Sequence, residues 1–126
     1  MIILDTCALL WLAQGGGRLT KKTLARIDKE LVVAVSAITA FEIAVKHAKG
    51  KLSLAAPPEE WWLRAIEHHR LEVISLSAET LIRATRLPAI HGDPADRFII
   101  ATALETSAPV VTSDTRFAEY GVSVVW

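Results

Sequence analysis

The sequence opens with Met1-Ile-Ile-Leu-Asp5-Thr-Cys-Ala-Leu-Leu-Trp-Leu12, which predicts a buried strand that runs directly into a helix. Ile2-Ile3-Leu4 is a short continuous apolar run with β-branched residues, typical of a strand covered on both faces in a parallel sheet. Asp5 follows at the carboxyl end of this strand, where open α/β sheets bind their ligands. The same residue is suited to cap a helix at residues 7–13, and taken alone it favours that structural role over a functional one.

The rest of the chain alternates strands and helices in the same way. Apolar runs predict further strands at residues 31–35, 71–76, 108–112 and 122–125, the last of them at an edge. Helices are expected at residues 20–29, 37–49, 59–69, 77–88 and 115–120, and another begins at Asp93-Pro94. Such alternation implies right-handed crossovers. We therefore expect an α/β fold of three layers, with a central parallel sheet of four to five strands and helices on both faces.

Composition narrows the class of protein. With 126 residues the chain is expected to form one domain, residues 1–126, and its 52% hydrophobic content suggests a surface covered by a partner or a second copy. The 14 basic residues balance the 14 acidic ones, which leaves only local basic patches as a route to nucleic acid. Cys7 is the single cysteine, and no apolar run approaches the roughly 18 residues that span a bilayer. We expect a soluble cytoplasmic protein without disulfides.

Four acidic residues are candidates for a metal site. Asp5 and Asp114 each follow an apolar strand, Asp96 lies near the start of a predicted helix, and Glu42 lies inside another. Taken singly, each has a structural explanation, as a helix cap or as the partner of Lys46. Together they can meet at one edge of the sheet, where gathered carboxylates stay ionised only if a cation holds them. Ligation by oxygen alone selects Mg²⁺ or Mn²⁺.

The four histidines give no sign of a zinc site. His47, His68, His69 and His91 show neither the His-Glu-x-x-His spacing nor a Cys/His ligand pattern. We therefore expect each of them at the surface or in the core without a functional role, and we do not expect a zinc hydrolase.

Several segments carry a family resemblance. They are Ile3-Leu4-Asp5-Thr6, Phe41-Glu42-Ile43 with Lys46 and Gly50-Lys51-Leu52, Leu87-Pro88-Ala89-Ile90-His91-Gly92-Asp93-Pro94-Ala95-Asp96-Arg97, and Val111-Thr112-Ser113-Asp114. On these segments the chain resembles the PIN-domain ribonucleases, most closely the VapC-type toxins of bacterial and archaeal toxin and antitoxin pairs. The resemblance covers essentially the whole chain, and residues 93–97 are its most specific part. Ala95 is a departure, because an aromatic residue often stands before the aspartate of that segment.

This resemblance implies a site and an activity. The acidic quartet of the family, which would act as catalytic residues and metal ligands, would fall on Asp5, Glu42, Asp96 and Asp114. Asp93 and Thr112 would be auxiliary residues of that site. Mg²⁺, or Mn²⁺ in its place, would support hydrolysis of an RNA phosphodiester to a 5′-phosphate and a 3′-hydroxyl. The resemblance also implies a homodimer and a cognate VapB-type antitoxin that neutralises the protein.

One dense basic segment follows Glu42. It contains Lys46, His47, Lys49 and Lys51. We expect Lys46, Lys49 and Lys51 to contact the RNA as it approaches the acidic site, because phosphate contacts supply most of the affinity for nucleic acid. The alternative is that these residues only complement the dipole at the carboxyl end of a helix.

Trp61 and Trp62 are neighbours in one predicted helix. Neighbouring side chains on a helix point about 100° apart, so both indoles should not easily face one core. We expect one of them at or near an interface with a second copy or with the antitoxin. The alternative is that both only cover the core.

Two other classes of protein remain open from the sequence. An aspartyl-phosphate type phosphotransfer protein also places an acid after its first strand. The phosphatase pattern, however, requires a second aspartate two residues later, at the position of Cys7. A non-catalytic α/β binding module would use the acids as helix caps and its apolar surface as the interaction site.

Overall fold

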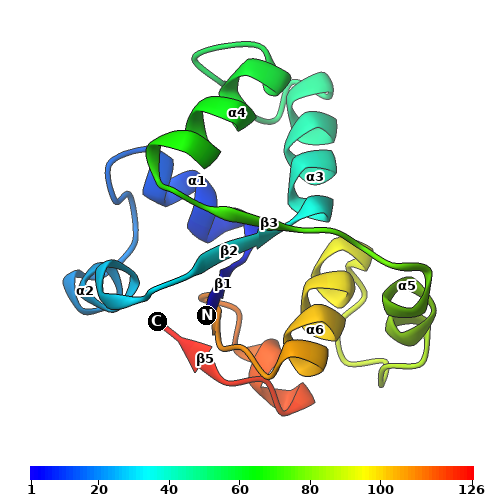
Figure 1. Ribbon diagram of the computed structural model, residues 1–126. Helices are drawn as coiled ribbons and strands as arrows, with labels where there is room; N and C mark the ends of the chain where they lie inside the picture. Colours follow the sequence, from blue (N-terminus) through cyan, green and yellow to red (C-terminus); the bar gives the residue numbers. More distant parts are fainter.

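A five-stranded parallel sheet forms the centre of the molecule. The computed structural model describes residues 1–126 and orders the strands β3-β2-β1-β4-β5, so the N-terminal strand lies in the middle of the sheet (Figure 1). All the strand pairings are parallel. The strands are β1 (Ile2–Leu4), β2 (Val33–Ser36), β3 (Glu72–Ile74), β4 (Val110–Val111) and β5 (Val124–Val125).

Helices cover both faces of this sheet. They are α1 (Thr6–Ala13), α2 (Lys21–Lys29), α3 (Ala37–Ala48), α4 (Pro58–His68), α5 (Ala78–Thr85), α6 (Pro94–Thr106) and the 3₁₀-helix η1 (Thr115–Tyr120). In Figure 1, α1 and α4 lie on one side of the sheet, whereas α6 lies on the other side with α5 beyond it. The predicted α/β class and the three-layer arrangement around a parallel sheet are therefore confirmed.

The core is divided by the alternation of side chains along the strands. Ile2 and Leu4 of β1 point to one face, where they join a cluster with Val35 and Leu9, and Ile3 points to the other face with Ile99 and Phe117. All of these side chains are fully buried. A strand whose neighbouring residues feed two separate cores is apolar throughout, which explains the continuous apolar run at the start of the sequence.

Several predicted elements are longer than the observed ones, and the strands expected at residues 108–112 and 122–125 shrink to Val110–Val111 and Val124–Val125. The strand expected at residues 71–76 pairs only over Glu72–Ile74, because β3 is an edge strand with β2 as its single neighbour. The helix expected at residues 77–88 ends at Thr85. The carbonyls of Ala84, in its last turn, and of Leu87, two residues beyond its end, accept hydrogen bonds from Arg97 Nη2 at 2.8 Å, so these groups are satisfied without further helix.

The expectation for the two neighbouring tryptophans was wrong in its geometric premise. Trp61 and Trp62 are both half-buried, and both pack against the same core cluster. The broad apolar face of α4 lies across this cluster, so side chains about 100° apart can each reach it. The tryptophans alone therefore give no reason to place an interface at α4.

The parallel strands bring their carboxyl ends to one edge of the sheet. Asp5 directly follows β1, and β4 is followed after two residues by Asp114.

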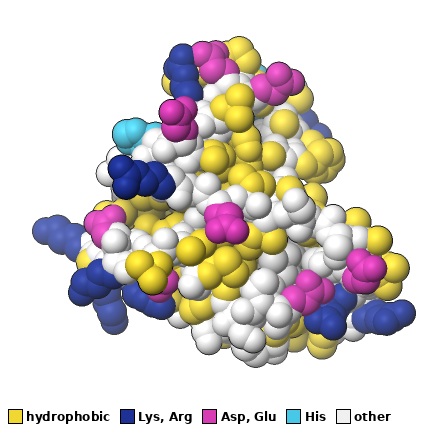
Figure 2. Space-filling model, in the orientation of Figure 1, with side chains coloured by type: hydrophobic (Ala, Val, Ile, Leu, Met, Phe, Trp, Pro, Cys, Tyr) yellow, Lys and Arg dark blue, Asp and Glu magenta, His cyan; other side chains and the backbone are white.

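On the face shown in Figure 2, basic side chains gather near α2 and near α5, with a band of hydrophobic side chains between them. None of the helices combines the length and the apolar character needed to cross a membrane.

Gly17 closes the turn after α1 and provides a test of this packing. Its φ is +49°, and a Cβ added there would lie 2.9 Å from Cβ and Cδ1 of Trp11. We expect Gly17→Ala to combine a left-handed strain of about 1–2 kcal/mol with the cost of displacing the indole, about 1–3 kcal/mol. Urea unfolding should show the loss of stability.

Gly15→Ala is the matched control for this variant. Gly15 also has a positive φ, +83°, but a Cβ there would meet nothing within 4 Å. Gly15→Ala should therefore lose only the stability that backbone strain costs, and it should unfold at a higher urea concentration than Gly17→Ala. Equal midpoints would contradict the close packing of the turn on Trp11.

Candidate active site

The four acidic residues singled out in the sequence lie around one cleft. Asp5 reaches it from the end of β1, Glu42 from α3, Asp96 from the first turn of α6, and Asp114 from the loop after β4. We call this the acidic cleft. It is lined by Asp5, Thr6, Cys7, Glu42, Lys46, Asp93, Asp96, Ser113 and Asp114.

Asp5 serves as a helix cap and as a cleft residue at the same time. Its Oδ1 accepts a hydrogen bond of 2.8 Å from the Ala8 N–H, and the side chain is largely buried. The pKa of this carboxyl is raised, mainly by burial and in addition by the charges of Glu42 and Asp114. Hydrogen bonds with Thr112 and Ala8 partly offset this increase. The structural and functional explanations of Asp5 are therefore compatible.

Thr112 lies directly beneath the acids and is fully buried. Its Oγ1 accepts a hydrogen bond of 3.0 Å from the Asp114 N–H, and its hydroxyl lowers the pKa of the Asp5 carboxyl. Thr112 therefore orients the loop after β4 and favours the ionised form of Asp5.

Glu42 contributes a carboxylate oxygen without a partner. Its Oε1 is buried and accepts no hydrogen bond, while Oε2 lies 3.8 Å from Lys46 Nζ across one helical turn. A buried oxygen that lacks a partner is costly, because it has lost its hydration without any replacement. A cation bound in the cleft would supply the partner that this oxygen lacks.

Asp93 and Asp96 both belong to the start of α6, but they are held differently. Asp93 Oδ1 caps the helix by accepting from the N–H groups of Ala95 at 2.9 Å and Asp96 at 3.4 Å. Burial raises the pKa of Asp96 to about 7, and the charges of Asp93 and Glu42 add to this effect. Burial together with four neighbouring acids therefore favours the protonated form of Asp96 when no cation is bound.

Asp114 has the opposite environment. Hydrogen bonds from the side chain of Arg116 are the main reason that the pKa of Asp114 falls to about 2. Arg116 donates from Nε to Oδ1 at 3.0 Å and from Nη2 to Oδ2 at 2.8 Å, which is a two-point contact. Asp114 thus stays ionised at the mouth of the cleft.

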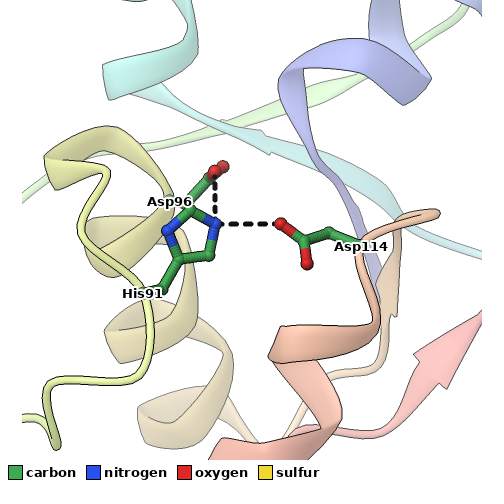
Figure 3. A group of neighbouring side chains, drawn as sticks. All are labelled: His91, Asp96 and Asp114. Carbon is green, nitrogen blue, oxygen red and sulfur yellow. Dashed lines mark hydrogen bonds and ion pairs between the residues drawn. The ribbon is translucent and has the colours of Figure 1, made fainter.

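His91 was expected only at the surface or in the core, and the structure adds a contact with two of the acids. Its ring is almost completely buried, and Nε2 lies 2.9 Å from Asp114 Oδ2 and 3.0 Å from Asp96 Oδ2. Figure 3 shows the ring between the two carboxylates. No zinc spacing in the sequence predicts this contact, because tertiary contacts of Arg97 place the loop that carries His91.

The hydrogen bonds of His91 determine which of its nitrogen atoms carries the proton. Nδ1 lies 3.1 Å from the Asp93 N–H and accepts from it, so the neutral ring carries its proton on Nε2. Nε2–H then donates towards Asp96 and Asp114. The group formed by His91, Asp96 and Asp114 has the spacing of a metal site, but a protonated Nε2 cannot ligate a metal.

A clamp formed by Arg97 and Tyr120 holds the loop that carries His91. Arg97 Nη1 donates to the carbonyls of Pro88 at 2.9 Å and His91 at 3.1 Å. The Tyr120 hydroxyl accepts from the His91 N–H at 2.7 Å and donates to the Pro88 carbonyl at 2.8 Å. This loop is consequently fixed by side chains from α6 and η1.

The acidic cleft fits a hard divalent cation. Its candidate ligands are carboxylate oxygens, and one of them, Glu42 Oε1, is buried without a partner. A bound cation would favour the ionised forms of Asp5 and Asp96, whose pKa values are raised by burial and by neighbouring acids. Of the lysines expected near RNA, only Lys46 lines the cleft, while Lys49 and Lys51 lie outside it.

Comparison with known proteins identifies the family. A family model for the PIN domain matches residues 2–122. Ribonuclease VapC22 of Mycobacterium tuberculosis (strain ATCC 25618 / H37Rv) is 32% identical over 120 residues, which cover 94% of this chain and 91% of that protein. This agrees with the resemblance found in the sequence.

Solved structures share the fold. A chain in the crystal structure of VapBC2 from Rickettsia felis, bound to a DNA fragment from their promoter, has a TM-score of 0.71 and 21% identity over 99% of this chain and 98% of that one. A chain of DNA-bound VapBC from Salmonella typhimurium has a TM-score of 0.70 and 22% identity, covering 98% and 96%. The chain belongs to the PIN-domain nucleases, a family that is typically metal-dependent, and is a homologue of the VapC ribonuclease toxins.

Proposed function

We propose that this protein is a Mg²⁺-dependent endoribonuclease toxin that hydrolyses RNA phosphodiester bonds. The observation that carries the metal requirement is the buried, unpartnered Glu42 Oε1 among the carboxylates of the acidic cleft. The homologue VapC22 is itself named a ribonuclease, which supports RNA as the substrate. The expected products are a 5′-phosphate and a 3′-hydroxyl.

Asp5, Glu42, Asp96 and Asp114 would hold the ion, either directly or through water. Mg²⁺ bound there would activate a water for attack on phosphorus and stabilise the leaving oxygen, and Mn²⁺ could take its place. Asp5 is already immobilised by β1 and by the Ala8 N–H, so little rearrangement is needed before it binds a cation.

Other residues of the chain prepare the cleft for this task. Lys46 lies beside Glu42 and offers a positive charge to the phosphate that enters the acidic cleft. Asp93 caps α6 and thereby orients the first turn that carries Asp96. Asp93 and Thr112 would act as auxiliary residues, because they position the acids and need not touch the ion.

His91 would act as a positioning residue. Its Nε2–H bridges Asp96 and Asp114, which would otherwise repel each other, and fixes the orientation of both carboxylates. Residues that orient metal ligands through a second hydrogen bond commonly affect metal affinity and activity without binding the ion themselves.

A cognate VapB-type antitoxin would be the partner of this toxin, and the toxin itself would form a homodimer. Two of the solved relatives are VapBC complexes, whose names join a VapB and a VapC protein, and this supports an antitoxin partner. Several large apolar side chains are exposed in the isolated chain, which leaves surface for both contacts. Leu31 and Leu63 are the most exposed of the aliphatic ones.

The first test replaces two of the acids by their amides. Asp5→Asn and Asp96→Asn each remove a negative charge from the cleft, while the amide side chain that replaces Asp5 can still cap α1. We expect cleavage of a labelled RNA in Mg²⁺ to fall by more than about 100-fold, the upper effect of replacing a residue that only orients a metal ligand. The urea midpoint without metal should not fall, because each amide removes an unfavourable buried charge.

Asp28→Asn is the control for this test. Asp28 lies on the exposed side of α2, away from the acidic cleft, so the same chemical change there should leave cleavage intact. Wild-type rates in either cleft variant would show that the site is assigned wrongly.

The second test separates the role of His91 from a merely structural one. His91→Leu removes the donor, and we expect a loss of activity of about 10- to 100-fold together with a higher Mg²⁺ concentration for half-maximal rate. His91→Gln can place an N–H near the position of Nε2 and should restore most of both values. If both variants lost activity equally, with an unchanged Mg²⁺ requirement, the bridging role would be refuted.

A further inference from the structure

A second hollow adjoins the acidic cleft and has a different chemistry. It is a groove of about 420 Å³ between α3 and the start of α6, and we call it the α3–α6 groove. Its apolar lining consists of Ile38, Phe41, Val45, Pro94, Ala95 and Phe98. Phe41 is 65% exposed, so one large aromatic ring stands open to solvent at the groove.

The groove is continuous with the acidic cleft. Glu42, Lys46 and Asp93 line both hollows, so a chain that leaves the cleft along α3 enters the groove directly. Phe41 precedes Glu42 in α3, which places the open ring one residue from a proposed metal ligand. A ligand longer than one nucleotide would therefore contact both places.

The charges around the groove suit a polyanion. Lys46, Lys49 and Lys51 line it, whereas the chain as a whole carries a formal net charge of zero. A phosphate backbone gains most electrostatic free energy where basic residues are concentrated in one groove of an otherwise neutral protein. An aromatic ring beside such cations is the combination that binds unpaired bases, because the ring stacks on the base and the cations hold the backbone.

We propose that the α3–α6 groove binds a single-stranded RNA segment next to the cleavage point, with one base stacked on Phe41 and phosphates held by Lys49 and Lys51. The inference rests on the proposed function, since it names where the substrate of that cleft lies. A base can stack on a side chain only if it is unpaired, so the groove selects single strands over duplexes. Ala95, which also lines the groove, adds only a small side chain to it.

Binding assays in EDTA test the groove without any cleavage. Fluorescence anisotropy would compare a short fluorescein-labelled single-stranded RNA with an abasic ribose-phosphate strand of equal length. We expect Phe41→Ala to weaken binding of the RNA about tenfold and to leave binding of the abasic strand unchanged. Phe41→Trp should retain the wild-type affinity, because an indole also stacks on a base.

Charge variants and a surface control complete the comparison. The double variant Lys49→Gln, Lys51→Gln should weaken binding of both the RNA and the abasic strand and should lower the salt dependence of binding. Phe41→Ala should leave the salt dependence unchanged. Leu31→Ala removes a fully exposed apolar side chain just before β2, remote from the groove, and should change nothing.

Two results would overturn the inference. One is equal loss of RNA and abasic-strand affinity in Phe41→Ala. The other is unchanged RNA binding together with altered light scattering or weakened antitoxin binding, which would make the groove a protein interface. If wild-type protein cleaved RNA in Mg²⁺ while Phe41→Ala bound RNA normally, only the groove assignment would fail. If it cleaved no RNA but bound it through Phe41, the proposed function would fail and the groove assignment would stand.

Discussion

The gathering of four carboxylates in one partly buried cleft is the constraint on which this site depends. The parallel pairing of β1 and β4 delivers Asp5 and Asp114 to one edge of the sheet, and α3 and α6 add Glu42 and Asp96. Burial, and after it the charges of the neighbouring acids, makes ionisation of Asp5 and Asp96 unfavourable and raises their pKa values. The fold tolerates the cluster because each acid is tied to a rigid element, and a bound cation would offset much of the repulsion.

The surroundings offset this repulsion unevenly. Asp114 is stabilised by Arg116 and His91, whereas Glu42 retains a buried oxygen with no partner. Asp114 is therefore held in position before an ion binds, whereas Glu42 gains most from ion binding, because its buried oxygen then acquires a partner. The clamp formed by Arg97 and Tyr120 extends the arrangement outward, since it fixes the loop from which His91 enters the cleft.

Much of this could be predicted from the sequence, for identifiable reasons. The apolar run Ile2-Ile3-Leu4 and the later strand runs predicted a parallel α/β fold, because strands buried on both faces leave a local pattern. Asp5 and Asp114 were found because they follow strand ends and Asp96 because it lies near a helix start, whereas Glu42, inside a helix, was assigned to the site through the family resemblance. His91 was missed because its partners are fixed by a loop whose path depends on Arg97, a tertiary contact without a local pattern. The argument about Trp61 and Trp62 failed because it used the angle between neighbours and ignored the breadth of the surface beneath α4.

The central claim is that these carboxylates form a divalent-cation site, and calorimetric titration with Mn²⁺ measures this most directly. Wild-type protein should show saturable binding, and Glu42→Gln should weaken it by at least about tenfold, because the amide replaces a carboxylate whose buried oxygen lacks any other partner. Glu79→Gln, an exposed change in the first turn of α5, should bind Mn²⁺ as the wild type does. Absence of saturable heat in the wild type, or equal affinity in Glu42→Gln, would contradict the account.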